Sequence, residues 1–118
     1  MKYNAKKVEL DGYKFDSQAE AKHYWFTLKP LLEKGEITHF KVHPKFEITI
    51  DGEKICNYIA DFSYFSQKAR VVEDVKGFKT PVYRLKKKLV EATYRGVKIS
   101  EILPKLYQSK KYSLPSQT

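Results

Sequence analysis

The sequence contains a single cysteine, Cys56, and has no long hydrophobic run. One cysteine cannot form a disulfide within the chain or a cysteine-rich zinc site, and this scarcity is typical of a reduced, cytoplasmic environment. No apolar stretch approaches the about 20 residues that a membrane-spanning helix needs, and no N-terminal run resembles a signal peptide. We therefore expect a cytoplasmic protein with no membrane partner, in which Cys56 is a small buried apolar side chain.

Acidic residues are scarce in the last part of the chain. Residues 76–118 contain 11 lysines and arginines but only Glu91 and Glu101, whereas residues 1–75 contain 12 basic and 12 acidic residues. The net charge of +9 therefore comes from the second part. A neutral part followed by a basic part suits a protein that approaches a polyanion such as nucleic acid. A solvated basic surface that keeps the protein soluble is the alternative.

The first third of the chain predicts a hairpin and a helix. Asp11-Gly12 between alternating apolar residues predicts a hairpin within residues 7–15. Ser17 predicts the start of a helix with an apolar stripe at helical spacing. Pro30 should kink or divide this helix, because proline cannot donate a hydrogen bond to the carbonyl four residues back, and Gly35 should end it.

The middle of the chain alternates apolar and polar residues and is rich in β-branched and aromatic side chains. This pattern predicts one strand that ends at the Asp51-Gly52 turn and a second strand over residues 55–65. A further short strand is expected over residues 71–76, and a turn at Gln67-Lys68 would make a hairpin of the last two.

The last part predicts a helix, a strand and a tail. The helix is predicted from Thr80 as the N-cap, proline at the next position and Gly96 just past the end. Residues 97–103 are predicted to form a final strand. The expected core face of the helix consists of Val82, Leu85, Leu89 and Ala92. Residues 1–104 should thus form one α/β domain with a mixed β-sheet flanked by helices. Residues 105–118 should form a basic, flexible tail, in which Lys110 and Lys111 add non-specific attraction.

Asp61 and the segment Asp74-Val75-Lys76 have the spacing of a catalytic site. Because side chains alternate along a strand, Asp74 and Lys76 should project from one face, with Glu73 and Val75 on the other. In the expected hairpin Asp61 lies directly opposite Asp74, and opposed residues are about 5 Å apart. Two carboxylates so close repel each other unless a cation such as Mg²⁺ lies between them, and phosphodiester cleavage needs such a cation. Two solvent-facing acids beside a structural lysine are the alternative.

Glu20 has two competing roles. Ser17-Gln18-Ala19-Glu20 has the form of a capping box, in which Glu20 reaches back to the Ser17 amide. Its helical position also borders the apolar stripe, so the side chain could face the sheet and a metal. The three histidines are expected to be structural, although His43 precedes a proline and could border the cleft.

The polar face of the second helix is the candidate DNA surface. It follows the Asp74 motif directly, and helix N-termini bind anions well. We expect contacts with the phosphate backbone from the following residues, with a merely solvated face as the alternative: Lys79, Thr80, Arg84, Lys87, Lys88 and Arg95.

Several motifs stand in order over about residues 3–103: Phe15-Asp16-Ser17, Glu20-Ala21, Pro44-Lys45-Phe46-Glu47, Tyr58, Ala60-Asp61-Phe62, Glu73-Asp74-Val75-Lys76-Gly77-Phe78-Lys79-Thr80, Leu85-Lys86 and Lys88. Together they resemble a small phage-encoded family that is similar in motif order to the PD-(D/E)xK nucleases. That superfamily includes phage Holliday-junction resolvases and transposon end-cleaving nucleases. Ala60 stands where the superfamily has proline, and His43 stands where glutamine is expected.

The resemblance implies a restriction-endonuclease-like core and a Mg²⁺-dependent endodeoxyribonuclease in which Mn²⁺ can substitute. Asp61, Asp74 and the Val75 carbonyl would bind the metal, and Glu20 would bind a second ion or a water molecule of the first. Lys76 would orient or activate the attacking water.

The expected substrate is branched or structured DNA in recombination or replication within a bacterial host cell. Such an enzyme could act as a homodimer. A catalytically silent DNA-binding protein and a factor that binds a host protein are the alternatives.

Overall fold

The centre of the structure is a four-stranded mixed β-sheet with the strand order β3-β6-β7-β8. The structure is a computed structural model that describes residues 6–116. The strands of the sheet are β3 (Thr38–Val42), β6 (Phe62–Ser66), β7 (Ala69–Val75) and β8 (Ile99–Ile102). β6 is antiparallel to both of its neighbours, whereas β8 is parallel to β7. The expected single α/β domain with a mixed sheet is confirmed.

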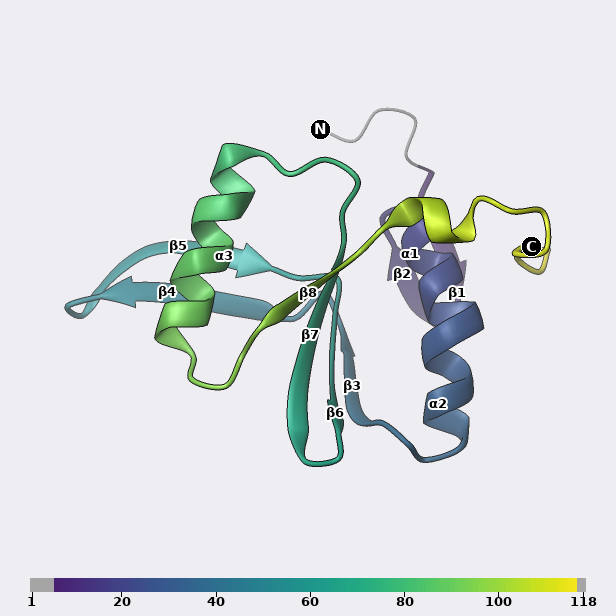
Figure 1. The fold of residues 1–118 in the computed structure, drawn as a ribbon, viewed down its shortest axis with the longest axis horizontal. Helices are drawn as coiled ribbons and strands as arrows, with labels where there is room; N and C mark the ends of the chain where they lie inside the picture. The colour runs from purple at the N-terminus through teal and green to yellow at the C-terminus, as the bar shows by residue number, and fades with distance from the viewer. Residues whose placement is uncertain (1–5, 117–118) are drawn as a thin grey trace.

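Helices and two small hairpins cover the two sides of this sheet (Figure 1). One side carries β1 (Val8–Leu10), β2 (Tyr13–Phe15), α1 (Gln18–His23), a π-helical turn (Tyr24–Leu28) and α2 (Lys29–Glu33). The other side carries β4 (Lys45–Ile50), β5 (Glu53–Ile59) and α3 (Pro81–Thr93), which connects β7 to β8. Each side has its own hydrophobic core, around Phe62 on the first and around Val72 and Val90 on the second. None of the helices within residues 6–116 combines the length and the hydropathy needed to cross a membrane.

The N-terminal hairpin and helix form as predicted. Asp11 and Gly12 both have positive φ, at 52° and 84°, as a two-residue hairpin turn requires. Ser17 caps α1. The helix is divided ahead of Pro30 by the π-helical turn, in which the Lys29 N–H donates to the Tyr24 carbonyl five residues back. Gly35, with φ of 75°, follows the end of α2.

The expected single strand over residues 55–65 is wrong. β5 ends at Ile59 and β6 begins at Phe62. β5 pairs with β4, whereas β6 pairs with β3 and β7, so the chain passes between two sheets at Ala60 and Asp61. No glycine or proline marks the break, although Ala60 and Asp61 are residue types that strands disfavour.

The β6–β7 hairpin has the predicted register. Ser66 pairs with Ala69 and Phe62 with Glu73, which leaves residues 67 and 68 as the turn. Gln67 and Lys68 have φ of 51° and 68°, the geometry that Asn-Gly usually supplies. The hydrophobic alternation of the two strands thus determines the register without a favourable turn sequence.

α3 begins after Thr80 as predicted, but its predicted core face is wrong. Val82 and Leu85 are 62% and 59% exposed. Ala92 is exposed as well, and Leu89 is half-buried. The helix is therefore rotated about its axis relative to the expectation from its aliphatic residues.

The buried face of α3 is formed by Tyr83 and Val90, with Tyr94 following the helix. The Tyr83 hydroxyl donates a hydrogen bond to the Glu101 carboxylate at 2.8 Å. The Tyr94 ring packs against Phe46, with 5.3 Å between ring centroids. These aromatic residues bury large area and also satisfy polar partners, which favours their face over the aliphatic one.

The chain after β8 packs against α1. A short 3-10 helix, Pro104–Tyr107, places Tyr107 at 7% exposure. Its hydroxyl lies 2.7 Å from His23 Nδ1 and 2.7 Å from Thr27 Oγ1, and Lys22 donates to its carbonyl at 3.2 Å. The segment predicted as a flexible tail, residues 105–118, thus begins inside the packed domain, and its last two residues lie outside the described part.

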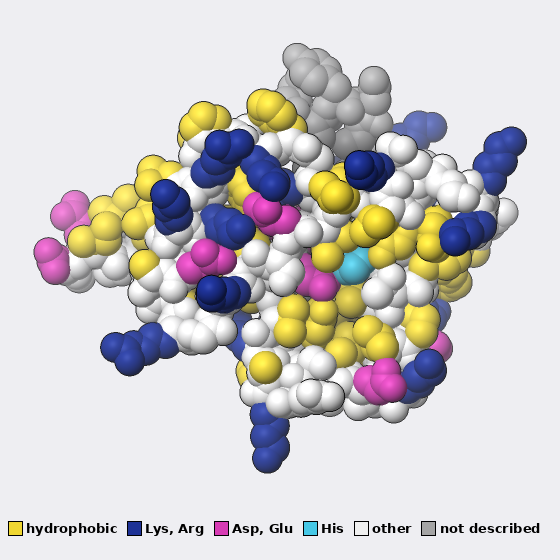
Figure 2. All heavy atoms as spheres, viewed as in Figure 1, with side chains coloured by type: hydrophobic (Ala, Val, Ile, Leu, Met, Phe, Trp, Pro, Cys, Tyr) yellow, Lys and Arg dark blue, Asp and Glu magenta, His cyan; other side chains and the backbone are white. Residues whose placement is uncertain are grey.

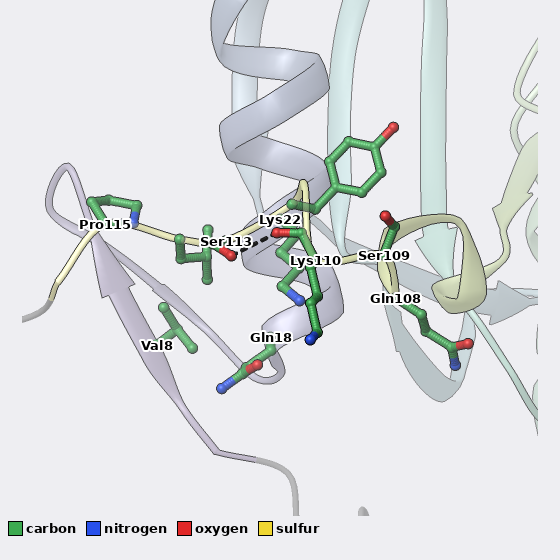
Figure 3. A pocket seen from close by; sticks show the side chains of 10 residues that line it. Val8, Gln18, Lys22, Gln108, Ser109, Lys110, Ser113 and Pro115 are labelled. Atoms are coloured by element: carbon green, nitrogen blue, oxygen red, sulfur yellow. Dashed lines mark hydrogen bonds between the residues drawn. The ribbon is translucent and has the colours of Figure 1, made fainter.

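A pocket of about 470 Å³ separates this segment from β1 and α1. Figure 3 shows Gln18 and Lys22 of α1 facing the chain from Gln108 to Pro115 across it. The Ser113 hydroxyl donates to the Lys110 carbonyl at 2.8 Å, which folds the segment back on itself. The side chains of Lys110 and Lys111 are exposed.

Candidate active site

The end of β7 presents its two adjacent acids to opposite sides of the sheet. Asp74 is 1% exposed and accepts a hydrogen bond from the Tyr58 hydroxyl on the α3 side. Glu73 is 7% exposed and faces α1, where it lies 2.7 Å from His23 Nε2 and accepts from the Tyr64 hydroxyl at 2.8 Å. The predicted alternation is therefore present. Glu73 belongs to a buried structural network, which leaves Asp74 as the acid of the motif.

Lys76 follows β7 on the same side as Asp74. Its ammonium nitrogen lies 4.9 Å from the centroid of the Tyr83 ring, a favourable cation–π position. Burial raises the pKa of Tyr83, as do its hydrogen bond to Glu101 and the charge of nearby Asp74. Asp74 and Lys76 thus share one neighbour, the Tyr83 phenol.

Asp61 lies where the chain passes between the two sheets, and it is 7% exposed. Its Oδ2 accepts a hydrogen bond from the Val75 N–H at 2.7 Å. Its own N–H donates to the Glu73 carbonyl at 3.1 Å. The regular ladder ends one residue earlier, at the pair of Phe62 and Glu73, so the side chain of Asp61 takes over a backbone hydrogen bond of β7. Asp61 is therefore adjacent to the Asp74-Val75 peptide.

Glu20 is completely buried in the first turn of α1. Its Oε2 accepts from the Ser17 hydroxyl at 3.2 Å, and the Ser17 oxygen accepts from the Glu20 N–H at 3.2 Å. Its Oε1 lies 3.4 Å from His43 Nε2, which is also 3.4 Å from Asp16 Oδ2. The two roles predicted for Glu20 are compatible, because one oxygen contacts the capping serine and the other faces His43.

His43 connects Glu20 to Asp61. Its side chain contacts Glu20, and its N–H donates to the Asp61 carbonyl at 3.0 Å. The sequence predicted a structural role for His43, with a place at the border of the cleft as the alternative, and gave no role to Asp16 or Tyr58. His43 precedes Pro44, and Tyr58 lies within the Asp61 motif, but neither position reveals the contact partner, since that partner comes from a distant part of the chain.

One group of possible metal-ligand atoms surrounds Glu20. Ligand atoms of Asp16, Glu20 and His43 lie within 4.8 Å of one another. Glu20, Asp61 and Asp74 are 0%, 7% and 1% exposed, and buried carboxylates need cations or hydrogen-bond donors to offset lost hydration. Hard divalent cations favour carboxylate oxygens. Among the described residues, Glu20 is the predicted ligand that belongs to this group, and Asp61 and Asp74 match such an ion in donor type alone.

The residues predicted to contact DNA divide into three kinds. Lys79 and Lys87 form ion pairs with Glu101, at 2.9 and 3.4 Å. Thr80 accepts the capping hydrogen bond from Tyr83 N at 3.1 Å. Arg84, Lys88 and Arg95 are exposed.

Arg95 lies at the far end of α3 from Thr80. Because the 13 residues of α3 span about 20 Å, these two residues cannot contact the same phosphate.

Burial raises the pKa of Glu101. Its hydrogen bonds with Lys79 and Tyr83 and the charges of Lys87 and Lys79 lower that pKa by more, so the pKa of Glu101 lies below its ordinary value. Glu101 is thus ionised at neutral pH and neutralises part of the predicted DNA surface. This restraint on Lys79 and Lys87 could not be predicted from the sequence, because Glu101 lies on β8.

Comparison with known proteins gives a family assignment. Residues 1–113 match the family described as "Protein of unknown function (DUF1064)". A search of curated proteins found no match, and a search of solved structures found none. Since the family match spans nearly the whole sequence, the chain belongs to the DUF1064 family.

Proposed function

We propose that this protein is a metal-dependent DNA endonuclease of the PD-(D/E)xK type with a restriction-endonuclease-like core. The superfamily combines a mixed sheet between helices with a helix-borne Glu, a strand Asp and an Asp/Glu-x-Lys motif. Here the mixed sheet has helices on both sides, and Glu20 lies in α1, Asp61 next to β6 and Asp74 in β7. This correspondence of elements and side chains supports the proposal.

The observation that carries the proposal is the hydrogen bond from the Val75 N–H to Asp61 Oδ2, at 2.7 Å. It joins the two motifs, which lie 14 residues apart, at the residue between Asp74 and Lys76. A merely solvent-facing acid would be exposed, whereas Asp61 is 7% exposed at the end of a strand ladder. Burial of two neighbouring carboxylates is costly and is retained where a function needs it.

The metal would be held by Asp61, Asp74 and the Val75 carbonyl, and Glu20 would bind a second ion or a water molecule of the first. A bound divalent cation supplies charge stabilisation to the phosphate and lowers the pKa of water. Lys76, which is held near Asp74 by the Tyr83 ring, would orient the attacking water and offset the negative charge that develops on the phosphate. Tyr58 would hold the orientation of Asp74 through its hydrogen bond.

The test is cleavage of labelled junction, flap, duplex and single-stranded DNA in Mg²⁺, Mn²⁺ or EDTA. We expect cleavage that requires the metal and is lost in Asp74→Asn and Lys76→Ala, with the thermal unfolding transition retained. Glu53→Gln and Lys98→Ala remove matching charges from exposed positions and should cleave at the wild-type rate. Wild-type cleavage by Asp74→Asn would refute the assignment. Binding of DNA without cleavage of any substrate would favour the catalytically silent alternative.

A further inference from the structure

A second basic site lies at the opposite end of α3 from the candidate active site. It is a groove of about 500 Å³ between the tip of the β6–β7 hairpin and the chain that leaves α3. The described residues that line it include three cationic side chains, Lys68, Arg70 and Arg95, and no acidic one. Phe65 and Tyr94 supply aromatic walls. Its composition suits the phosphates of a nucleic acid.

The walls of the groove are held by packing. The Arg70 guanidinium lies 4.9 Å from the centroid of the Phe46 ring, and that ring packs against Tyr94. The Tyr94 hydroxyl donates to the Glu47 carbonyl at 2.6 Å. Arg70 and Tyr94 are thus restrained before any ligand binds, which reduces the conformational entropy lost on binding.

A row of exposed cations joins this groove to the candidate active site. Arg84 and Lys88 are four residues apart and therefore lie along one side of α3, and Arg95 follows the end of the helix. All three are exposed. The acid that interrupts the row, Glu91, accepts a hydrogen bond from the Ile99 N–H at 2.8 Å. Figure 2 shows Lys and Arg side chains gathered over α3 and others projecting from the hairpin end of the molecule.

We propose that duplex DNA runs along α3, with its scissile phosphate at Asp74 and Lys76 and its flanking backbone in the groove of Lys68, Arg70 and Arg95. The position of the scissile phosphate at Asp74 and Lys76 rests on the proposed nuclease function. α3 is about 20 Å long, which corresponds to about six base pairs at 3.4 Å each. A duplex shorter than that cannot reach both ends.

The inference is tested by DNA binding in EDTA, where no cleavage occurs. The variant Lys68→Asn/Arg95→Gln removes two exposed cations of the groove, and asparagine tolerates the positive φ of residue 68. Lys14→Gln/Lys34→Gln removes the same charge from exposed positions on β2 and after α2. Fluorescence anisotropy with a labelled duplex of about 20 base pairs, at several salt concentrations, gives the affinity and its salt dependence.

We expect the groove variant to reduce the slope of log affinity against log salt by nearly two, and the affinity by about tenfold at low salt, since each phosphate contact contributes about 0.9 to the slope. A DNA hairpin with a stem of about five base pairs cannot reach both ends of the track, so it should show a smaller difference between the two variants. Equal slopes for both variants on the long duplex would overturn the inference, and so would a loss confined to single-stranded DNA. Cleavage together with equal slopes would support the nuclease function and reject DNA binding along α3. The predicted slopes without cleavage would support DNA binding along α3 and reject the nuclease function.

Discussion

The hydroxyl of Tyr58 on β5 donates a hydrogen bond to Asp74 Oδ2 at the end of β7. The two residues belong to different sheets, and both are buried, at 4% and 1% exposure. A donor to a ligating carboxylate fixes its orientation and tunes its basicity. Tyr58 is therefore expected to be a positioning residue for the metal.

Tyr58→Phe should weaken metal binding by about tenfold or more, the usual effect of losing a partner of a ligand. The measurement is cleavage rate against Mg²⁺ concentration: the half-saturating concentration should rise, with a smaller change in rate at saturation. Tyr64→Phe is the matched control, because it removes a buried phenol that donates to Glu73 on the other side of the sheet. Equal Mg²⁺ requirements in the two variants would contradict a positioning role and leave only a structural one.

Glu101→Gln should increase DNA affinity, because it releases Lys79 and Lys87 from their ion pairs. With two more cations free to contact phosphates, the salt slope of duplex binding should steepen by about one to two. Anisotropy titrations in EDTA measure this slope. Glu36→Gln, which removes an exposed acid beyond α2, controls for the change in net charge. An unchanged slope in Glu101→Gln would show that the two lysines do not contact DNA.

Glu101 also predicts a pH dependence of stability. Its carboxyl pKa is lowered by folding from an ordinary value of 4.5. A lowered pKa means that the folded state favours the ionised form, so the contribution is complete above about pH 4.5 and is lost as pH falls through the lower folded value. The unfolding free energies of wild type and Glu101→Gln, measured by urea titration from pH 6 to pH 3, should converge as pH falls. A constant difference across that range would contradict the ion-pair role.

Local sequence signals predicted the parts of the fold that depend on the backbone alone. Asp11-Gly12, Ser17 and Gly35 have conformations that their residue types favour, so these boundaries agree with the structure. Gln67 and Lys68 show the complementary case. Their turn has no favourable residue, and the register follows instead from the alternating faces of two strands.

The parts that were not predicted depend on contacts between distant segments. The break between β5 and β6 has no glycine or proline, and Ala60 is completely buried where the two sheets meet. The alternation that places Asp74 and Lys76 on one side of the sheet could be predicted from the strand pattern. The contacts of His43 with Glu20 and of Tyr58 with Asp74 could not be predicted, because they require the positions of whole elements.

The orientation of α3 gives a stability prediction. Val82→Ser and Leu85→Gln should change the unfolding free energy by less than about 0.5 kcal/mol, since both side chains are more than half exposed. Val90→Ala should cost about 1–3 kcal/mol, because Val90 is completely buried against the sheet. Urea unfolding measures all three. Larger losses of unfolding free energy in Val82→Ser and Leu85→Gln than in Val90→Ala would support the core face first expected from the aliphatic residues.

The contact between His23 and Tyr107 makes the last prediction, which concerns the C-terminal segment. The Tyr107 hydroxyl lies 2.7 Å from His23 Nδ1, and His23 Nε2 lies 2.7 Å from Glu73 Oε1, so a buried chain of hydrogen bonds joins the segment to β7. Tyr107→Phe removes one member and leaves a buried partner unsatisfied, which should cost about 1–3 kcal/mol. Tyr112→Phe should lower the unfolding free energy by less. Within the described residues no hydrogen bond is found for the Tyr112 hydroxyl, and its ring contacts remain in the variant.

Truncation after Ile102 should destabilise the domain at least as much as Tyr107→Phe, since it also removes the Tyr107 ring and the hydrogen bond from Lys22 to the Tyr107 carbonyl. The measurement is urea unfolding of the full chain, the two point variants and the truncated chain under one set of conditions. If the truncated chain unfolds like the full one, the segment is the independent tail that its composition suggests. If Tyr107→Phe and Tyr112→Phe are equal, the hydrogen-bond chain through His23 contributes nothing to holding the segment against α1.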